Sequence, residues 1–289
     1  MSRLLIIADP QEHCAATPRG LELAAKLGLA ADVLAFTYES MSGLQVSTDE
    51  KRALRQRLLE QRRTTVRNRI VKYQRIDQDV KLRVIWSKDL HSHINRLCTK
   101  RDYYAVVKTG HRSESLTHVS LDWKLLRECP APVLIVAKKR WHRAKPVLAA
   151  LDLGTRLPAK RALNKRVLAS AAHMATALGV DLEIITAIEV PVLLADLDLI
   201  DPRQYTRDAK QSMQPAIAEL ARYQGIAESA FMLQRGPVER VIMSRAAKIG
   251  AQIVVMGTVG RKGIRARLIG NTAEKVLQHL KTDVLAFKP

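Results

Sequence analysis

Short apolar runs alternate with segments of helical periodicity along the whole chain. After each apolar run, Leu, Ala, Val and Ile recur at helical spacing in a stretch that also carries many of the charges. Strands that alternate with amphipathic helices are typical of βαβ units, and strands that are apolar on both faces are typical of parallel sheets. The pattern therefore predicts an α/β fold. Strands are expected at, or ending at, residues 4–8, 31–36, 84–86, 105–107, 133–136, 147–151, 181–188, 231–233, 253–256 and 284–287.

The order of these features repeats once, which predicts two domains. Each half begins with an apolar strand that ends at an aspartate, Asp9 in the first half and Asp152 in the second. A basic segment without periodicity, residues 137–146, lies between the halves. We therefore expect two doubly wound domains in tandem, residues 1–140 and 141–289, each with a five-stranded parallel sheet flanked by helices.

A glycine-bearing loop near the end of the chain is the main candidate for chemistry. Gly257, Gly260 and Gly270 stand between the apolar run 253–256 and the helical segment 272–280. Such a loop can bring backbone N–H groups close to a phosphate, and the N-terminus of the next helix favours an anion. The spacing matches neither a P-loop nor a dinucleotide fingerprint, and a tight turn without a ligand is the alternative. Basic side chains that could meet phosphate oxygens are Arg261, Lys262, Arg265 and Arg267.

The glycine pattern resembles that of a known family. Gly-x2-Gly-x9-Gly followed by Asn271 and Thr272 is similar to the nucleotide-binding loop of the universal stress protein family, and the string 257–274 resembles its tandem, E-type branch. The resemblance covers essentially the whole chain. It implies an adenine-nucleotide alpha-hydrolase-like fold in both halves. It also implies ATP or another adenine nucleotide as ligand, with or without Mg, and a role as a stress sensor or regulatory binding protein.

The resemblance also implies a set of ligand-binding residues. The aspartate that ends the first strand of the second half, Asp152, is expected to contact the adenosine part of the nucleotide, and Ala187 is expected to line the adenine site. A carboxylate can accept hydrogen bonds from ribose hydroxyls or an adenine amino group, whereas the alternative is an aspartate that only caps a turn. The family often has Gly-Ser after this aspartate, which this chain lacks. The full expected set is Asp152, Leu153, Gly154, Thr155, Ala187, Met256, Gly257, Val259, Gly260, Arg261, Gly270, Asn271 and Thr272.

The first half lacks the glycine loop. Gly110 is one position out of register, Arg112 replaces the second glycine, and Val119 or Ser120 replaces the third. A β-branched residue cannot adopt glycine conformations without strain. We therefore expect the first half to serve as a structural partner or to bind something else, and we interpret His111 as a surface histidine.

The net charge of +20 is unusual for a chain of this composition. It favours polyanionic partners such as nucleic acid, although a solvated basic surface is the simpler interpretation. The helix predicted over residues 51–75 is rich in arginine, and Leu54, Val66 and Ile70 are among the residues expected to form its apolar face. No base-reading signature accompanies it. A basic polyanion-binding module and a binder of a lipid-like ligand are therefore the alternative functions.

The sequence argues against several compartments and several kinds of chemistry. Cys14, Cys98 and Cys129 are odd in number and widely spaced, which argues against a disulfide framework or a zinc site and predicts a cytoplasmic protein. No apolar run approaches the roughly 18 residues of a membrane span. No catalytic motif is present, so an enzyme is not expected, with slow ATP hydrolysis left open. No metal site is expected either.

The final strands of the two halves are apolar and would form exposed sheet edges. Such edges invite aggregation unless they are paired or covered. Single-domain relatives commonly pair through this strand, so the resemblance implies that residues 133–136 and 284–287 join the halves as an internal pseudo-dimer. A further homodimer is left open. The linker 137–146 has about ten residues, which can span roughly 30 Å when extended.

Overall fold

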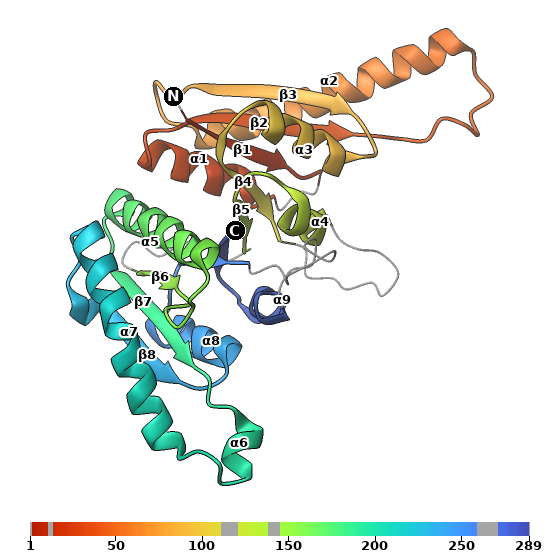
Figure 1. Cartoon of the computed structure of the whole chain (residues 1–289). Helices are drawn as coiled ribbons and strands as arrows, with labels where there is room; N and C mark the ends of the chain where they lie inside the picture. The colour runs from red at the N-terminus through yellow and green to blue at the C-terminus, as the bar shows by residue number, and fades with distance from the viewer. Residues whose placement is uncertain (1, 11–13, 111–120, 138–144, 259–270, 289) are drawn as a thin grey trace. The chain divides into compact units, whose positions relative to one another are not determined.

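The chain forms two compact units, Met1–Lys138 and Lys139–Pro289. The computed structural model describes residues 2–10, 14–110, 121–137, 145–258 and 271–288. In both units, helices pack around a central sheet, as Figure 1 shows. Within the described residues, no helix is both long enough and apolar enough to cross a membrane. Pairing of the two units through their final strands stays a prediction.

The sheet of the first unit is parallel and has the strand order β3-β2-β1-β4-β5. The chain runs from β1 outward through β2 to β3 and then returns to the other side of β1. Its strands are β1 (Arg3–Ala8), β2 (Ala30–Thr37), β3 (Val80–Trp86), β4 (Tyr103–Thr109) and β5 (Val133–Val136). Its helices are α1 (Ala16–Lys26), α2 (Thr48–Tyr73), α3 (Leu90–Lys100) and α4 (Leu121–Glu128).

The second unit repeats this topology with the order β10-β9-β6-β7-β8, again parallel. The predicted pair of doubly wound, five-stranded sheets is therefore confirmed. The strands are β6 (Val147–Ala150), β7 (Leu182–Ile188), β8 (Phe231–Arg235), β9 (Ile253–Gly257) and β10 (Asp283–Phe287). The helices are α5 (Pro158–Leu178), α6 (Val192–Asp196), α7 (Pro202–Gln224), α8 (Val238–Ile249) and α9 (Asn271–His279), and a 3₁₀ turn, η1 (Glu228–Ala230), precedes β8.

Helices cover both faces of each sheet. Neighbouring residues of a strand point to opposite sides, so each strand contributes side chains to both faces. In β1, Ile6 lies under α1, where a Cβ on Gly20 would come within 2.7 Å of its Cγ1. The preceding residue, Leu5, faces the other side and lines a cavity together with Leu97 of α3. Continuous apolar strands result, and β1 is buried along its whole length.

Local sequence signals set the ends of the long helices. Ser47 caps α2 by accepting from the backbone N–H of Glu50 at 3.2 Å, while the Glu50 carboxylate accepts from the Ser47 N–H at 2.8 Å. This reciprocal pair is a capping box, which satisfies two donors that the helix leaves free. Gly179 and Gly225 end α5 and α7 with φ of 67° and 65°, a left-handed conformation that glycine adopts without strain.

Helix α2 differs from the prediction in how much of it packs. Val66 and Ile70 are buried, but Leu54 is 37% exposed. The first turns of α2 extend beyond the ends of β2 and β3 (Figure 1), so they have no sheet to cover. Burial of the predicted apolar face is therefore complete only in the C-terminal half of the helix, whereas Leu58 and Leu59 are half-buried.

Candidate functional site

The carboxyl edge of the second sheet brings the two predicted parts of the site together. Strands β6 and β9 are neighbours, with Ala150 paired to Met256. The chain continues from β6 toward β7 and β8 on one side, whereas β9 and β10 lie on the other. The gap between β6 and β9 is thus the topological switch point, where ligands of open α/β sheets bind. Asp152 and Gly257 both follow the paired residues at this edge.

The Asp152 carboxylate is accessible at this edge. Its side chain is 49% exposed, and Oδ2 accepts a hydrogen bond from Nζ of Lys160 at 3.0 Å. The backbone of Asp152 is fixed by a buried amide: its N–H donates to Oδ1 of Asn164 at 3.1 Å, and its C=O accepts from Nδ2 at 2.8 Å. A carboxylate held in place and open to solvent can accept hydrogen bonds from a bound hydroxyl or amino group.

Lys160 and Asn164 were not among the predicted site residues. They lie one turn apart in α5, so they project from one side of the helix toward Asp152. The sequence contains a signal for Asn164, because this polar residue interrupts the apolar stripe that includes Leu163 and Val167. A polar side chain on a buried stripe needs a specific partner. No comparable signal distinguishes Lys160 from the other basic residues of the chain.

The turn after Asp152 packs against α7. Leu153 is buried, and a Cβ on Gly154 would lie 3.1 Å from Cε of Met213 in α7. Thr155 accepts a hydrogen bond on Oγ1 from the Leu157 N–H at 3.3 Å, which leads the chain into α5. These contacts give the turn a defined shape, so it can present the Asp152 carboxylate at the edge.

Ala187 lies in the neighbouring strand β7 and is only partly buried. A ligand at this edge could therefore contact it. The residue before it, Thr186, is buried and donates from Oγ1 to the C=O of Leu151 at 3.0 Å. This bond ties the end of β6 to β7 beyond the last strand residue. This hydrogen bond therefore stabilises the carboxyl edge where β6 adjoins β7.

The end of β9 is also tightly packed. Met256 is buried, and a Cβ on Gly257 would lie 2.6 Å from Cδ2 of Leu163. Thr258 is bound to the end of β10, with its N–H and its Oγ1 donating to the C=O of Phe287 at 2.6 and 3.0 Å. Gly257 is not among the residues with positive φ. Lack of space beside α5, rather than an unusual φ, therefore requires glycine at this position.

The remainder of the predicted loop lies outside the described residues. This applies to Val259, Gly260, Arg261 and Gly270 of the expected set. Asn271 and Thr272 begin helix α9. The phosphate cradle therefore stays a prediction, whereas both of its anchoring points, the end of β9 and the start of α9, are defined.

The carboxyl edge of the first unit has a different chemistry. Asp9 follows β1 as Asp152 follows β6, but its side chain is only 5% exposed and its Oδ1 lies 3.8 Å from Nζ of Lys108. The same ammonium contacts Oδ1 of Asp122 in α4 at 2.7 Å and donates to the Thr109 C=O at 2.9 Å. A buried lysine thus occupies this edge, and Asp9 is turned into the protein.

Lys108 and Met256 hold equivalent positions. Gly110 and Thr258 each donate their N–H to the last residue of the neighbouring final strand, and Lys108 and Met256 stand two residues before them. The second unit therefore has the apolar side chain of Met256 where the first has the ammonium of Lys108. Because Asp122 and the Thr109 C=O already bind this buried ammonium, it is not a free cation for a phosphate.

Comparisons with known proteins place the chain in a family. Residues 145–288 match the Universal stress protein family. Universal stress protein E from Escherichia coli K12 is 30% identical, over 99% of this chain and 93% of that protein. The chain belongs to the universal stress protein family. This confirms the resemblance predicted from the glycine loop.

Solved structures agree with this membership. A protein from Pseudomonas aeruginosa PAO1, solved without a known function, is 25% identical with a TM-score of 0.69, covering 100% of this chain and 93% of that one. A universal stress protein from Archaeoglobus fulgidus DSM 4304 shares the fold at 18% identity and a TM-score of 0.67, covering 99% and 96%. A universal stress protein in complex with cAMP matches 50% of this chain at a TM-score of 0.31, which is too distant a likeness to carry its ligand over.

Membership in the universal stress protein family fits the difference between the two units. The family match falls on the second unit, which contains Asp152 and the glycine loop. The first unit repeats the topology but places Lys108 and Asp122 at the corresponding edge.

Proposed function

We propose that this universal stress protein binds ATP or a related adenine nucleotide at the carboxyl edge of its second unit and acts as a sensor or regulatory binding protein. One observation carries the proposal. The exposed Asp152 carboxylate stands at the switch point beside the end of β9, from which the glycine loop begins. This is the edge at which ligands of such sheets bind.

The charges at the edge suit a nucleotide. Asp152 can accept hydrogen bonds from ribose hydroxyls, while Lys160, which is bound to it at 3.0 Å, can turn toward a phosphate. A surface pair of this kind contributes little to stability, so exchanging it for ligand contacts costs little. The Gly260 and Gly270 backbone and the Arg261 side chain would bind the phosphates.

Calorimetric titration of the whole chain with ATP, ADP and AMP tests this function. Asp152→Ala should weaken binding roughly 10- to 100-fold, since a hydrogen bond to a charged group contributes about 1.5–3 kcal/mol. Gly260→Val should abolish binding because it puts a branched side chain where a phosphate would lie. Asp208→Ala, on the exposed side of α7, is the matched control and should bind as the wild type does. Absence of binding by all three nucleotides at millimolar concentration would overturn the proposal.

The same titration, repeated with Mg²⁺ and with EDTA, measures whether the metal accompanies the nucleotide. Mg²⁺ usually binds through substrate phosphates and one or two carboxylates. ATP affinity that depends on Mg²⁺, with AMP affinity that does not, would indicate a bridging ion. Release of inorganic phosphate from ATP, followed over hours, tests slow hydrolysis.

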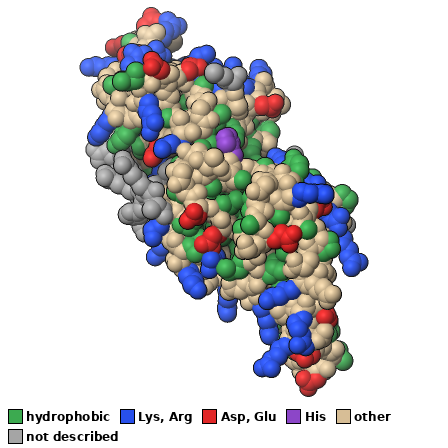
Figure 2. Space-filling view, turned by 90° about the vertical axis from the view of Figure 1, so that its left-hand side faces the viewer, with side chains coloured by type: hydrophobic (Ala, Val, Ile, Leu, Met, Phe, Trp, Pro, Cys, Tyr) green, Lys and Arg blue, Asp and Glu red, His purple; other side chains and the backbone are tan. Residues whose placement is uncertain are grey.

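A second candidate function is binding of a polyanion through α2. The observation that favours it is the set of exposed basic residues on the part of α2 that extends beyond the sheet. Some of these side chains have partners: Arg52 pairs with Asp49 at 3.0 Å, and Arg55 lies over the Trp86 ring at 5.5 Å. On the face shown in Figure 2, Lys and Arg side chains are interspersed with acidic and apolar ones. A continuous basic patch is therefore not seen on that face.

Salt dependence distinguishes this second function. Binding of duplex DNA or RNA should weaken steeply between 50 and 200 mM salt, because phosphate contacts release counterions. Arg52→Gln/Arg55→Gln/Arg57→Gln, in the N-terminal half of α2, should reduce the affinity and the salt slope. Arg203→Gln/Arg207→Gln/Arg222→Gln on α7 removes the same charge elsewhere and should leave the slope unchanged. Equal effects of the two triple variants would show that only net charge matters.

A further inference from the structure

The first unit contains a cavity that is separate from the carboxyl edge. Its volume is about 240 Å³, and it lies between α3 and the face formed by β1, β2 and β3. The apolar residues that line it on the face toward α3 include Leu5, Leu34 and Leu97. Leu5 is near the amino end of β1, whereas Asp9 follows the carboxyl end. The cavity therefore does not belong to the edge at which a nucleotide is expected.

Two lateral rows of the sheet give this cavity its polar lining. Leu5, Asp32 and Lys81 are in register across three strands, and Leu34 is in register with Arg83. Residues two apart on a strand share a face. Asp32, Leu34, Lys81 and Arg83 therefore all belong to the face that α3 covers.

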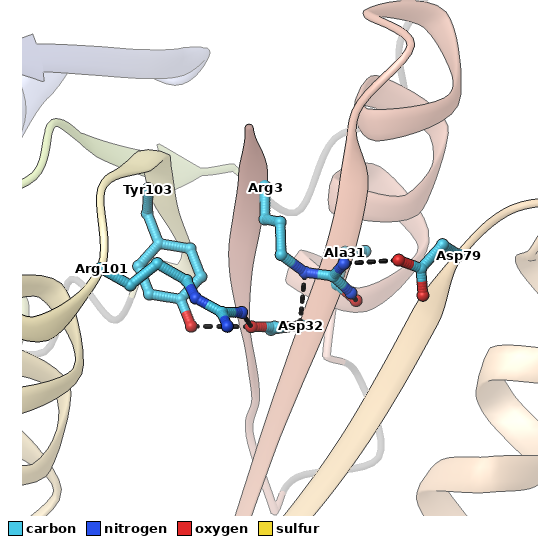
Figure 3. A network of polar contacts seen from close by, with 6 residues as sticks. All are labelled: Arg3, Ala31, Asp32, Asp79, Arg101 and Tyr103. Carbon is cyan, nitrogen blue, oxygen red and sulfur yellow. Dashed lines mark hydrogen bonds and ion pairs between the residues drawn. The ribbon is translucent and has the colours of Figure 1, made fainter. Parts of the chain in front are cut away.

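The carboxylate in the cavity wall is already satisfied. Oδ1 of Asp32 accepts from Nε of Arg3 at 2.7 Å, while Oδ2 accepts from the Tyr103 hydroxyl at 2.7 Å and from Nη1 of Arg101 at 3.1 Å. Figure 3 shows Arg101 and Tyr103 reaching Asp32 together, while Arg3 connects Asp32 to Asp79. Asp32 therefore holds its neighbours in place and offers little acceptor capacity to a ligand.

The cations in the wall exceed the carboxylates. Lys81, Arg83 and Arg101 line the cavity, and Arg3 stands beside it, against the two carboxylates of Asp32 and Asp79. Four cations against two carboxylates leave an excess of two positive charges. Among the residues described, no hydrogen bond or ion pair joins Lys81 or Arg83 to another side chain. Cations beside an apolar cavity favour an anion with an apolar part.

The equivalent place in the second unit is arranged differently. Glu183 holds the register position of Asp32, and Arg245 of α8 donates to it directly, with Nε 2.7 Å from Oε2. Arg245 precedes Val254 by the same number of residues as Leu97 precedes Val106, and those two valines pair with equivalent residues of β6 and β1. Leu97 thus stands where the second unit has its arginine.

The basic lining is likewise particular to the first unit. Met232 is paired with Ile185 as Arg83 is paired with Leu34, so the second unit has an apolar residue where the first has a cation. The first unit therefore has an apolar residue, Leu97, where the second has Arg245, and a basic residue, Arg83, where the second has Met232. Both differences make the space suitable for an amphipathic anion.

We propose that this cavity binds a small amphipathic anion, a carboxylate or a phosphate monoester on a short apolar group. The apolar group would lie against Leu5, Leu34 and Leu97, and the anion would lie between Lys81 and Arg83. The volume is below the 300–1,000 Å³ of typical ligand pockets, so the ligand is of about the size of benzoate or phenyl phosphate. This binding is independent of any nucleotide at the second unit.

Methyl NMR of the whole chain, labelled at the leucine methyl groups, tests the proposal with benzoate and phenyl phosphate as probes. We expect saturable shifts at Leu5, Leu34 and Leu97, with benzyl alcohol binding at least tenfold more weakly. Lys81→Gln/Arg83→Gln should weaken binding of both anions at least tenfold. Arg52→Gln/Arg63→Gln on α2 removes the same charge and should bind as the wild type does. The ratio of the two affinities then tells carboxylate from phosphate.

A second variant closes the cavity with the residue that the second unit uses. Leu97→Arg should reach Asp32, abolish the shifts at Leu5 and Leu34, and leave a folded spectrum elsewhere. The proposal is overturned if neither anion shifts these methyl groups at 10 mM, if benzyl alcohol binds equally well, or if Lys81→Gln/Arg83→Gln binds as tightly as the wild type.

Discussion

Gly257 at the end of β9 and Leu163 in α5 are in contact, and a Cβ on Gly257 would lie 2.6 Å from Cδ2 of the leucine. Real Cβ atoms do not come so close to a neighbour, so either the helix or the strand would have to move. Leu163 itself is buried, which leaves its side chain little room to turn away. The first glycine of the loop therefore sets the approach of α5 to β9, whether or not a ligand is bound.

Gly257→Ala is expected to lower the free energy of unfolding by about 1–3 kcal/mol, the usual cost of an overpacked core. In the double variant Leu163→Ala/Gly257→Ala, the shortened side chain leaves space for the added methyl group. Its loss of stability should therefore be smaller than the sum of the losses in Leu163→Ala and Gly257→Ala. Urea unfolding of the wild type and the three variants measures the coupling. Strictly additive costs would show that the clash is relieved by another route.

The ionic cluster of the first unit gives a second prediction. Lys108→Met leaves the Asp9 and Asp122 carboxylates buried without this ammonium and should cost about 3–5 kcal/mol. Lys160→Met breaks the half-exposed pair with Asp152 in the second unit and should cost less than about 1 kcal/mol. Urea unfolding of both variants tests the contrast. Equal costs would mean that the Lys108 ammonium is more solvated than its burial indicates.

The second unit also suggests how the first could do without its lysine. Asp122 and Ala273 precede Val133 and Val284 by the same number of residues, and these valines pair with equivalent positions of β4 and β9. Lys108→Met/Asp122→Ala would therefore install the pair that the second unit has. This double variant should be more stable than Lys108→Met alone, because one of the two buried carboxylates is removed along with the cation.

The fold could be predicted from the sequence because its signals are local and repeated. Apolar runs fixed the strand positions, and the single repeat gave two units of the same topology. The packing of α2 could not be predicted in the same way. Leu54 has helical spacing from Leu58, yet it is 37% exposed because the helix extends past the sheet at that point. Periodicity indicates which face is apolar, but not how far the neighbouring element extends.

The position of the candidate site in the fold was predictable to the extent that it depends on strand ends. Asp152 and Gly257 follow neighbouring strands, as the glycine pattern and the α/β rule indicated. Lys160 and Asn164 were missed because their contacts with Asp152 depend on which side of α5 faces the edge of the sheet. Likewise, no local pattern marks Asp122 as a partner of Lys108. Contacts between a helix and the edge of a sheet require the three-dimensional register.

Asn164 provides a third prediction, on the support of Asp152. Asn164→Leu matches the apolar stripe of α5 but leaves the N–H and C=O of Asp152 without their partner. An unsatisfied buried polar group costs about 1–3 kcal/mol, so the melting temperature should fall despite the gain in hydrophobicity. Asn164→Asp keeps the acceptor and loses the donor, so its melting temperature should lie between those of the wild type and Asn164→Leu. A variant as stable as the wild type would mean that water replaces the amide.

Tyr103 gives a prediction about alkaline pH. Its side chain is 8% exposed and its hydroxyl donates to Asp32, so ionisation would bury a phenolate beside a carboxylate. Burial and the bond to Asp32 raise the pKa of Tyr103 to about 12, against about 10 in an unfolded chain. Between these two values the unfolded chain releases the proton while the folded chain keeps it. Stability from this group is therefore complete below about pH 10 and decreases as the pH rises toward 12.

Comparison with Tyr103→Phe isolates this effect from other groups that titrate in the same range. At neutral pH the variant should be less stable by about 1 kcal/mol, because the bond to Asp32 is lost. The wild type should then lose about 2–3 kcal/mol more than the variant between pH 10 and 12, so that its advantage vanishes and reverses. Urea unfolding in steps from pH 8.5 measures both curves, with Tyr73→Phe at an exposed tyrosine as control. Parallel curves for the wild type and Tyr103→Phe would show that the phenol ionises at the same pH in the folded and unfolded chains, and that the hydrogen bond to Asp32 does not hold its proton.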